Sequence, residues 1–159
     1  MSAPEHLLLR AVSVAQSARD NGNHPFGALL TDSSGRELLS AENTVVTASD
    51  ATGHAETNLV RLATARYSTA ELREMTLYTS TEPCAMCSGA IYWSGIGTVV
   101  YALGEDELRA MTGDDPVNPT LELPCRSVFA AGQRSVAVFG PFDIVEARAV
   151  HEAFWHPMA

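Results

Sequence analysis

The sequence contains no lysine, so its ten basic residues are all arginine, and they stand against 19 aspartate and glutamate residues. The formal net charge is −9. Proteins bind nucleic acids largely through Lys and Arg side chains that neutralise phosphates, so this balance argues against a polynucleotide partner. We therefore expect no nucleic acid among the partners of the protein.

Cysteine is also scarce, with three residues in a chain of 159. The chain begins without a basic stretch followed by a long apolar run, so no secretory signal is expected, and we expect a cytoplasmic location. In that compartment a few cysteines indicate metal binding or catalysis before disulfides.

Charge is missing altogether between Cys84 and Gly104, a length of about 20 residues that can indicate a membrane span. Gly95 and Gly97 interrupt this stretch near its middle. A buried helix, a turn and a buried strand explain it better, because both are apolar throughout when a sheet is covered on two faces. No membrane partner is expected.

The apolar residues recur with a period near 3.6 in some segments and form short runs in others, which predicts alternating helices and strands. Helices are expected over 6–20, 54–67, from Pro83 onward, over 105–111 and over 143–159. Strands are expected over 26–32, 37–43, 75–81, 98–103 and 135–142, with Gly35 in a hairpin turn between the first two. This order predicts one domain over 1–159, a three-layer α/β/α sandwich around a mixed sheet of about five strands.

Two short motifs carry the chemistry. His54 and Glu56 open one predicted helix, and Cys84 and Cys87 open the next. Residues three apart at a helix start share a face, and the free backbone N–H groups there favour thiolates. Two thiolates and one imidazole leave the fourth position of tetrahedral Zn²⁺ open to water, as in catalytic zinc sites.

Glu56 would then lie beside that open position. Zinc lowers the pKa of a bound water to about 7, and a neighbouring carboxylate can take and return its proton. A lone C-x-x-C also fits a redox pair, half of a structural zinc site, or chance. A structural zinc would need a fourth ligand, and Cys125 is the remaining cysteine, which we expect to be a core or loop thiol. The combination of both motifs favours a hydrolytic zinc site.

The segments "HAE" at His54 and "PCAMC" at Pro83 match the H-x-E…P-C-x-x-C signature, and the chain thereby resembles the zinc-dependent nucleobase deaminases of the cytidine deaminase-like superfamily. "HPFGALL", "TSTEPCAMCSGAIYW" and "TGDD" look closest to the guanine deaminase branch. The resemblance implies that His54, Cys84 and Cys87 bind zinc and that Glu56 carries the proton.

The resemblance also implies substrate-binding residues. Asn43 matches an amide that bonds the base, Phe26 a stacking face, and Asp114 and Asp115 an acidic pair that holds the substrate. Trp155 lies in the predicted helix 143–159, which resembles a tail that closes the pocket in that branch. Each also has a structural interpretation: a turn asparagine, core aromatics, and acids that end a helix. His24, beside Pro25, is either a contact at the edge of the pocket or an exposed loop histidine, and we favour the exposed histidine.

The chain departs from the guanine deaminase branch at Ala51 and Gly53 and over 115–133. We therefore expect a zinc aminohydrolase that acts on a small amino-substituted nucleobase, with a guanine-like purine favoured. Cytosine or an analogue, a tRNA adenosine, and a zinc-binding module without activity are the alternatives. The resemblance also implies a homodimer.

Overall fold

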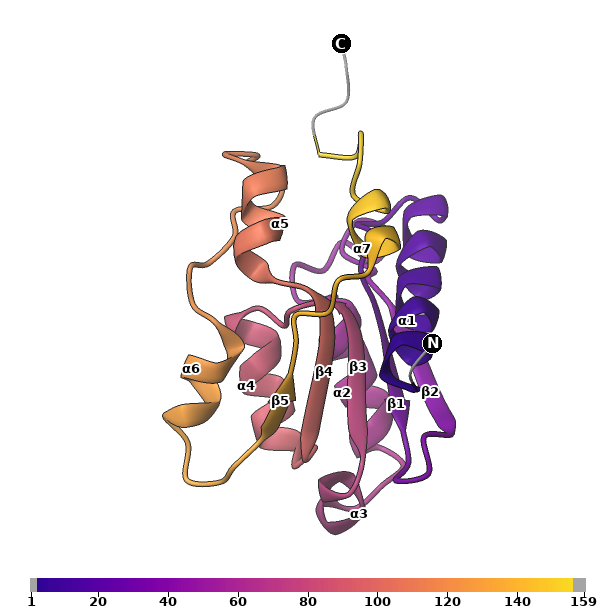
Figure 1. Ribbon diagram of the computed structural model, residues 1–159, viewed down its shortest axis with the longest axis vertical. Coiled ribbons are helices and arrows are strands. Elements are labelled where there is room, and N and C mark those ends of the chain that lie inside the picture. Colours follow the sequence, from indigo (N-terminus) through magenta and orange to yellow (C-terminus); the bar gives the residue numbers. More distant parts are fainter. Residues whose placement is uncertain (1–2, 156–159) are drawn as a thin grey trace.

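The computed structural model describes residues 3–155 and places five strands in one mixed sheet with helices on both faces (Figure 1). The strand order is β2-β1-β3-β4-β5. The strands are β1 (Gly27–Thr31), β2 (Glu37–Glu42), β3 (Thr76–Thr81), β4 (Thr98–Leu103) and β5 (Ala137–Phe139). The predicted layered α/β fold is confirmed.

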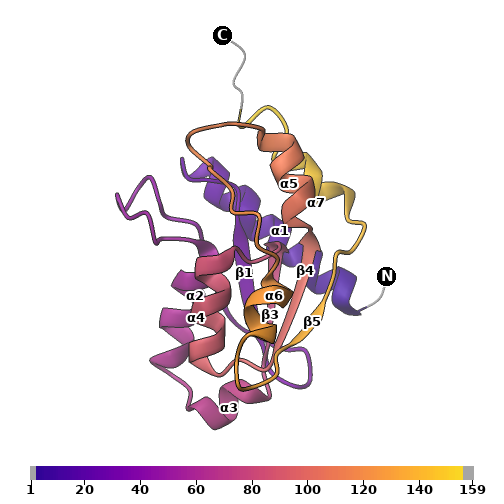
Figure 2. The same ribbon diagram turned by 90° about the vertical axis from the view of Figure 1, so that its left-hand side faces the viewer.

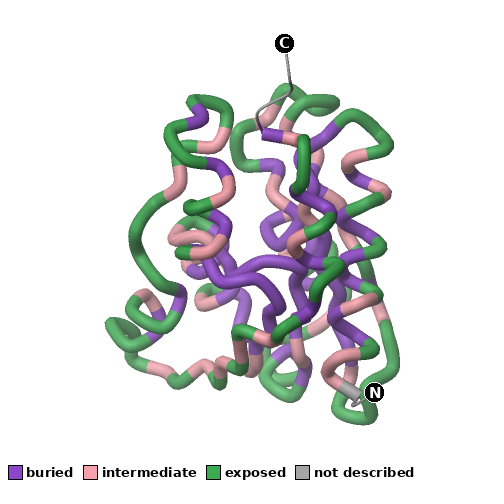
Figure 3. The backbone as a smooth tube through the Cα atoms, turned by 45° about the horizontal axis from the view of Figure 1, so that its top comes forward, coloured by how far each residue is buried: buried purple, intermediate pink, exposed green. Residues whose placement is uncertain are grey.

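Helices cover the two faces of the sheet over separate apolar clusters. The helices are α1 (Ala3–Asp20), α2 (Ala55–Thr64), α3 (Thr69–Arg73), α4 (Ala85–Ser94), α5 (Glu105–Thr112), α6 (Cys125–Ala130) and α7 (Val145–Ala149). One cluster joins α1, α5 and α7 to the sheet, and the other joins α2, α4 and α6 to it. Figure 3 shows the strands as the buried centre between them.

The strand directions bring several chain ends to one edge of the sheet. β1 is antiparallel to β2 and β3, whereas β3, β4 and β5 are parallel. The carboxyl ends of β2, β3 and β4 therefore meet at the edge where β1 begins. Such an edge is where open α/β sheets bind ligands. Phe26, Asn43, Glu82 and Gly104 all lie next to a strand end at this edge.

Gly27 sets how closely α1 approaches the sheet. A Cβ atom at this position would lie 2.4 Å from the backbone nitrogen of Ala15. Because only glycine avoids that overlap, α1 packs directly on the start of β1. The contact fixes the position of Phe26, which immediately precedes β1 at the ligand-binding edge.

The predicted helix over 143–159 is wrong in extent. Only Val145–Ala149 is helical, and turns follow up to Phe154, with Ala153 in the left-handed region at φ 54. The Arg19 guanidinium donates to the backbone carbonyls of Val150 and Glu152, which a continuing helix would need for its own hydrogen bonds. Residues 156–159 of this prediction lie outside the described residues.

Two short helices were absent from the prediction. α3 begins with a capping box between Ser68 and Glu71, a signal that the sequence itself carries. α6 follows Pro124, in a stretch for which neither a helix nor a strand was predicted. β5 spans three residues, less than the predicted 135–142. Over residues 3–155, no helix is long and apolar enough to cross a membrane.

Arg134 makes the fold's most extensive side-chain contact with one helix end. Its guanidinium donates to the carbonyls of Ile91, Tyr92 and Ile96, at and just beyond the C-terminal end of α4. We predict that Arg134→Ala lowers the free energy of unfolding by about 1–3 kcal/mol, since these carbonyls lose charged donors. Urea denaturation followed by circular dichroism measures the change.

The matched control is Arg36→Ala, because the Arg36 side chain is 74% exposed in its ion pair with Asp32. An exposed pair of this kind contributes little, so a change below about 0.5 kcal/mol is expected. Equal losses in the two variants would contradict the role assigned to Arg134.

Candidate active site

Three metal-binding side chains meet where two helices begin. His54 is the residue that precedes α2, Cys84 precedes α4, and Cys87 lies in the first turn of α4. The two helices pack side by side beneath the edge where β3 ends. The backbone N–H groups of a first helical turn have no partner within the helix, so they favour negative charge on the thiols.

The distances between these side chains fit zinc. The Nδ1 atom of His54 lies 3.6 Å from Sγ of Cys84 and 3.5 Å from Sγ of Cys87. Tetrahedral bonds of about 2.3 Å to sulfur and about 2.0 Å to nitrogen place neighbouring ligand atoms about 3.5 Å apart. All three donor atoms lie within 4.8 Å of one another, and no other group among the described residues forms such a cluster.

The pKa values of the three side chains in this cluster are shifted in different directions. A hydrogen bond from Cys87 lowers the pKa of Cys84 to about 4, although burial opposes this shift. A hydrogen bond with His54 lowers the same pKa further. The hydrogen bond with Cys84, together with burial, raises the pKa of Cys87 well above its ordinary value. The bond to Cys84 raises the pKa of His54. A divalent cation would allow both thiols to be ionised, which suits the donor set.

Glu56 lies directly beside the metal donors and is 4% exposed. The Thr79 hydroxyl lies 2.8 Å from its Oε1, while Oε2 lies 3.5 Å from Sγ of Cys87. Burial, and then the negative charge of Cys84, raise the pKa of the Glu56 carboxyl. A carboxyl with a raised pKa, fixed beside a metal site, is suited to accept and return a proton near neutral pH.

A cavity of about 360 Å³ opens above this group, within the size range of small-molecule sites. Its floor includes His54, Glu56 and Cys84. The remaining walls come from the edge of the sheet, from α5 and from the segment between α5 and α6. These walls are His24, Phe26, Val45, Ala51, Glu82, Met86, Glu105, Leu108 and residues 117–121.

Phe26 is the one predicted substrate-binding residue among these walls. The buried Asn43 accepts a hydrogen bond from the backbone N–H of Val45. Asp115 accepts one from the backbone N–H of Val117, and Asp114 is exposed. Neither aspartate nor Asn43 belongs to the described residues that line the cavity, so their contact with a substrate stays a prediction.

Trp155 lies behind the cavity wall. Its ring packs on His24 and Phe26, and its Nε1 donates to Nδ1 of His151. Burial lowers the pKa of His151 to about 4. The interpretation of His24 as an exposed loop residue is wrong, because it is 8% exposed between Trp155 and the cavity.

Sequence reasoning did not single out Glu82 and Glu105, both buried in the cavity wall. The two carboxyl oxygens of Glu82 accept from the backbone N–H groups of Glu105 and Cys125, at 3.0 and 2.9 Å. Glu82 therefore fixes where α5 and α6 begin. Burial, and then the charges of Cys84 and Glu82, raise the pKa of Glu105 to about 8. The position of Glu82, two residues before Cys84, was the available signal.

Comparison with known proteins agrees with this site. Residues 1–103 match the family model described as "Cytidine and deoxycytidylate deaminase zinc-binding region". Fold and site thus define a zinc-dependent deaminase, and the metal is the zinc that the family binds. The chain belongs to the cytidine and deoxycytidylate deaminase family.

Relatives that match most of the chain carry different substrate names. The probable cytosine deaminase of Schizosaccharomyces pombe is 42% identical over 148 residues, 93% of this chain and 90% of that protein. The guanine deaminase of Bacillus subtilis is 38% identical over 112 residues, 70% of this chain and 71% of that protein. The structure of guanine deaminase from Nitrosomonas europaea is similar with a TM-score of 0.78 at 28% identity, covering 95% of this chain and 84% of that one.

We predict one zinc ion per chain in the purified protein, measured by elemental analysis after loosely bound metal is removed. Cys87→Ala should reduce this ratio to near zero, because two ligands do not hold zinc tightly. Cys125→Ala is the matched control, since Cys125 is buried outside the metal cluster and should leave the ratio unchanged. Full zinc content in Cys87→Ala would exclude this ligand set.

Proposed function

We propose that the protein hydrolyses the amino group of a small, free nucleobase and releases ammonia. The observation that carries this proposal is the position of Glu56, buried against the zinc donors at the floor of the cavity. A purely structural zinc site needs no unpaired carboxyl beside the metal. For this reason we prefer an enzyme over an inactive zinc-binding module.

In the proposed reaction, zinc, Glu56 and Thr79 have separate roles. Zinc, when bound by this set, supplies Lewis-acid chemistry that makes water a nucleophile at neutral pH. The Glu56 carboxylate takes a proton from the attacking water and passes it to a ring nitrogen beside the amino-bearing carbon. It then takes the remaining proton of the added hydroxyl group and gives it to the amine, so that the C–N bond breaks, ammonia leaves and a carbonyl group forms. The Thr79 hydroxyl holds Oε1 of Glu56 in place. Oε2 faces the metal donors.

The cavity suits an uncharged aromatic ring more than a nucleotide. Phe26 supplies a ring face, while Val45, Met86 and Leu108 supply apolar contacts. No arginine lies among the described residues that line it, so nothing there neutralises a phosphate. In this proposal the C-terminal segment closes the pocket from behind, because Trp155 packs on Phe26. Asn43, Asp114 and Asp115 remain candidate contacts.

Guanine and cytosine are the two candidate bases. The guanine-like purine favoured from the sequence is supported by the structural similarity to the N. europaea enzyme. Cytosine is supported by the similarity to the S. pombe protein, which extends over 93% of the chain and so includes most of the segments around the cavity. The homodimer and the cytoplasmic location stay predictions.

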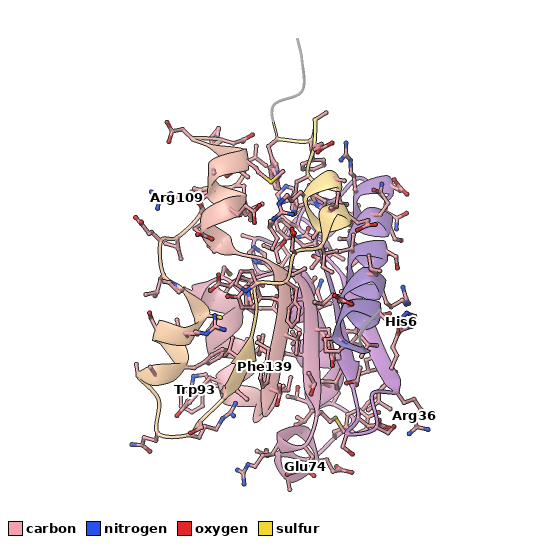
Figure 4. All side chains as sticks on the ribbon, in the orientation of Figure 1. His6, Arg36, Glu74, Trp93, Arg109 and Phe139 are labelled. Carbon is pink, nitrogen blue, oxygen red and sulfur yellow. The ribbon has the colours of Figure 1, made fainter. Side chains whose placement is uncertain are left out.

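Glu56→Gln should keep zinc and fold but lower kcat by about 10²-fold or more, because an amide cannot carry the proton. The measurement is ammonia release by the zinc-loaded variant. Glu74→Gln is the matched control, because this exposed residue lies at the end of the molecule away from α5 and α7 (Figure 4). Turnover near that of the control would remove Glu56 from the mechanism.

We predict that free guanine or cytosine is deaminated and that tRNA is not, because a net charge of −9 gives little attraction to phosphates. Ammonia release is measured over a panel of free bases, the matching nucleosides and tRNA. Inosine in the treated tRNA, or salt-sensitive tRNA binding, would overturn this prediction.

A further inference from the structure

His24 lies in the short segment between α1 and β1, and Figure 2 shows that α1 ends at the end of the molecule where α5 and α7 lie. His24 is 8% exposed and lines the cavity above the zinc donors. Neither of its ring nitrogens has a hydrogen-bond partner among the described residues, where Asn118 Nδ2 is the only side-chain nitrogen or oxygen both unpaired and fully shielded from solvent. The ring nitrogens of His24 therefore keep access to open space, and that space is the cavity that His24 lines.

The His24 ring has one hydrogen to donate. Burial lowers the pKa of His24, so the ring is neutral near pH 7. A neutral imidazole carries one N–H donor and one bare acceptor nitrogen. A buried donor without a partner costs free energy, which a hydrogen-bond acceptor on a bound ligand would offset. We therefore expect a ligand in this cavity to present an acceptor to His24.

Donors are scarce among the side chains that line the cavity. Those that carry nitrogen are His24, His54 and Asn118. His54 belongs to the metal cluster, and Asn118 Nδ2 is shielded from the open space. The glutamates of the lining accept hydrogen bonds when they are ionised. Thr120 has a hydroxyl group, but this residue is only half-buried, so water can pair with it. His24 is therefore the buried donor that is free to meet an acceptor on the ligand.

The position of the His24 ring is fixed by its neighbours. It makes edge contacts with Trp155 and Phe154, with 5.3 and 6.0 Å between ring centroids. The preceding residue, Asn23, accepts hydrogen bonds through its Oδ1 from two backbone N–H groups in the loop after β2, which ties the two segments together. A donor held in place before the ligand arrives is effective in recognition, because little further order is lost on binding.

We propose that the N–H group of His24 donates a hydrogen bond to the ring carbonyl oxygen of the substrate base. Guanine and cytosine both have such an oxygen, and adenine does not. The assignment rests on the proposed deamination of a free base, and it names the substrate class as amino-substituted bases that also carry a ring carbonyl. A base without the carbonyl leaves the donor unpaired, and this kind of discrimination is stronger than that of an apolar pocket.

The test compares variants that differ in the nitrogens of this side chain. His24→Phe keeps an aromatic ring against Trp155 and removes both nitrogens, and His24→Leu removes them without an aromatic ring. His24→Gln keeps an N–H donor. His6→Phe is the matched control, because His6 is exposed on α1 and lies outside the cavity lining. Zinc content and circular dichroism are recorded for every variant, so that lost metal or unfolding is not mistaken for lost recognition.

Each variant is measured on the deaminated base and on two analogues of it. 2-Aminopurine lacks the carbonyl group of guanine, and 4-aminopyrimidine lacks that of cytosine. 6-Thioguanine and 2-thiocytosine keep the ring N–H and replace the carbonyl oxygen by sulfur, a weaker acceptor. They therefore separate recognition of the oxygen from recognition of the ring N–H. KM and kcat are determined for the base, and the inhibition constant for each analogue.

His24→Phe and His24→Leu should raise KM for the base about tenfold or more, with a smaller change in kcat. The inhibition constant of the analogue without a carbonyl should stay at the wild-type value, and that of the thio analogue should rise less than KM does. His24→Gln should recover part of the lost affinity. His6→Phe should leave all of these constants unchanged.

An unchanged KM in His24→Phe and His24→Leu, in a wild type that is active, would overturn the inference. An equal loss for the base and the analogue without a carbonyl would contradict it, because the ring would then have a structural role. Equal losses for the base and its thio analogue would also contradict it, since His24 would then not recognise the oxygen. If the proposed function itself fails, the wild type releases no ammonia from any base, and the inference fails with it.

Discussion

The convergence of His54, Cys84 and Cys87 on one cation is the constraint on which the site depends. The distances of 3.5 and 3.6 Å from His54 Nδ1 to the two sulfur atoms suit a tetrahedral zinc, and they require the starts of α2 and α4 to lie together. Without a cation the thiols share protons unequally, with the pKa of Cys84 lowered and that of Cys87 raised. Because Glu56 is in the first turn of α2, the same arrangement brings its carboxyl to the metal.

Glu82 extends this arrangement to the rest of the cavity. It lies between the end of β3 and Cys84, and its carboxyl oxygens hold the first backbone N–H groups of α5 and α6. The residue that leads into the metal site therefore also fixes the starts of both helices. A change at Glu82 would leave two buried N–H groups unpaired, which is costly. The positions of the reaction centre and of the wall above it are thus linked through one side chain.

Local patterns explain what the sequence predicted well. His54, Glu56, Cys84 and Cys87 occupy the first turns of helices, where short spacing in the sequence implies closeness in space. The strands 76–81 and 98–103 are rich in β-branched and aromatic residues, which favour strands. The predictions that were wrong concern residues whose structure depends on contacts with parts of the chain far away in the sequence. The helix at 143–159 ends early because Arg19, from the other end of the chain, takes its carbonyls. His24 is buried against Trp155, and the sequence pattern near His24 does not indicate that contact.

The zinc donors lie in the part of the chain that the family model matches, whereas the cavity walls extend beyond that part. The family match covers residues 1–103, which contain the zinc donors, Glu56 and Phe26. Glu105 and Asn118 follow that region, on α5 and on the segment after it. The chemistry of zinc and a proton carrier is the same for every amino-substituted base, so the matched region is compatible with both guanine and cytosine. A preference between bases must come from groups that contact the ring away from the amine. The cavity walls come both from the matched region, at His24, Phe26 and Val45, and from beyond it, at Glu105 and residues 117–121. Family membership therefore accounts for the reaction of this protein, and it does not by itself select between guanine and cytosine.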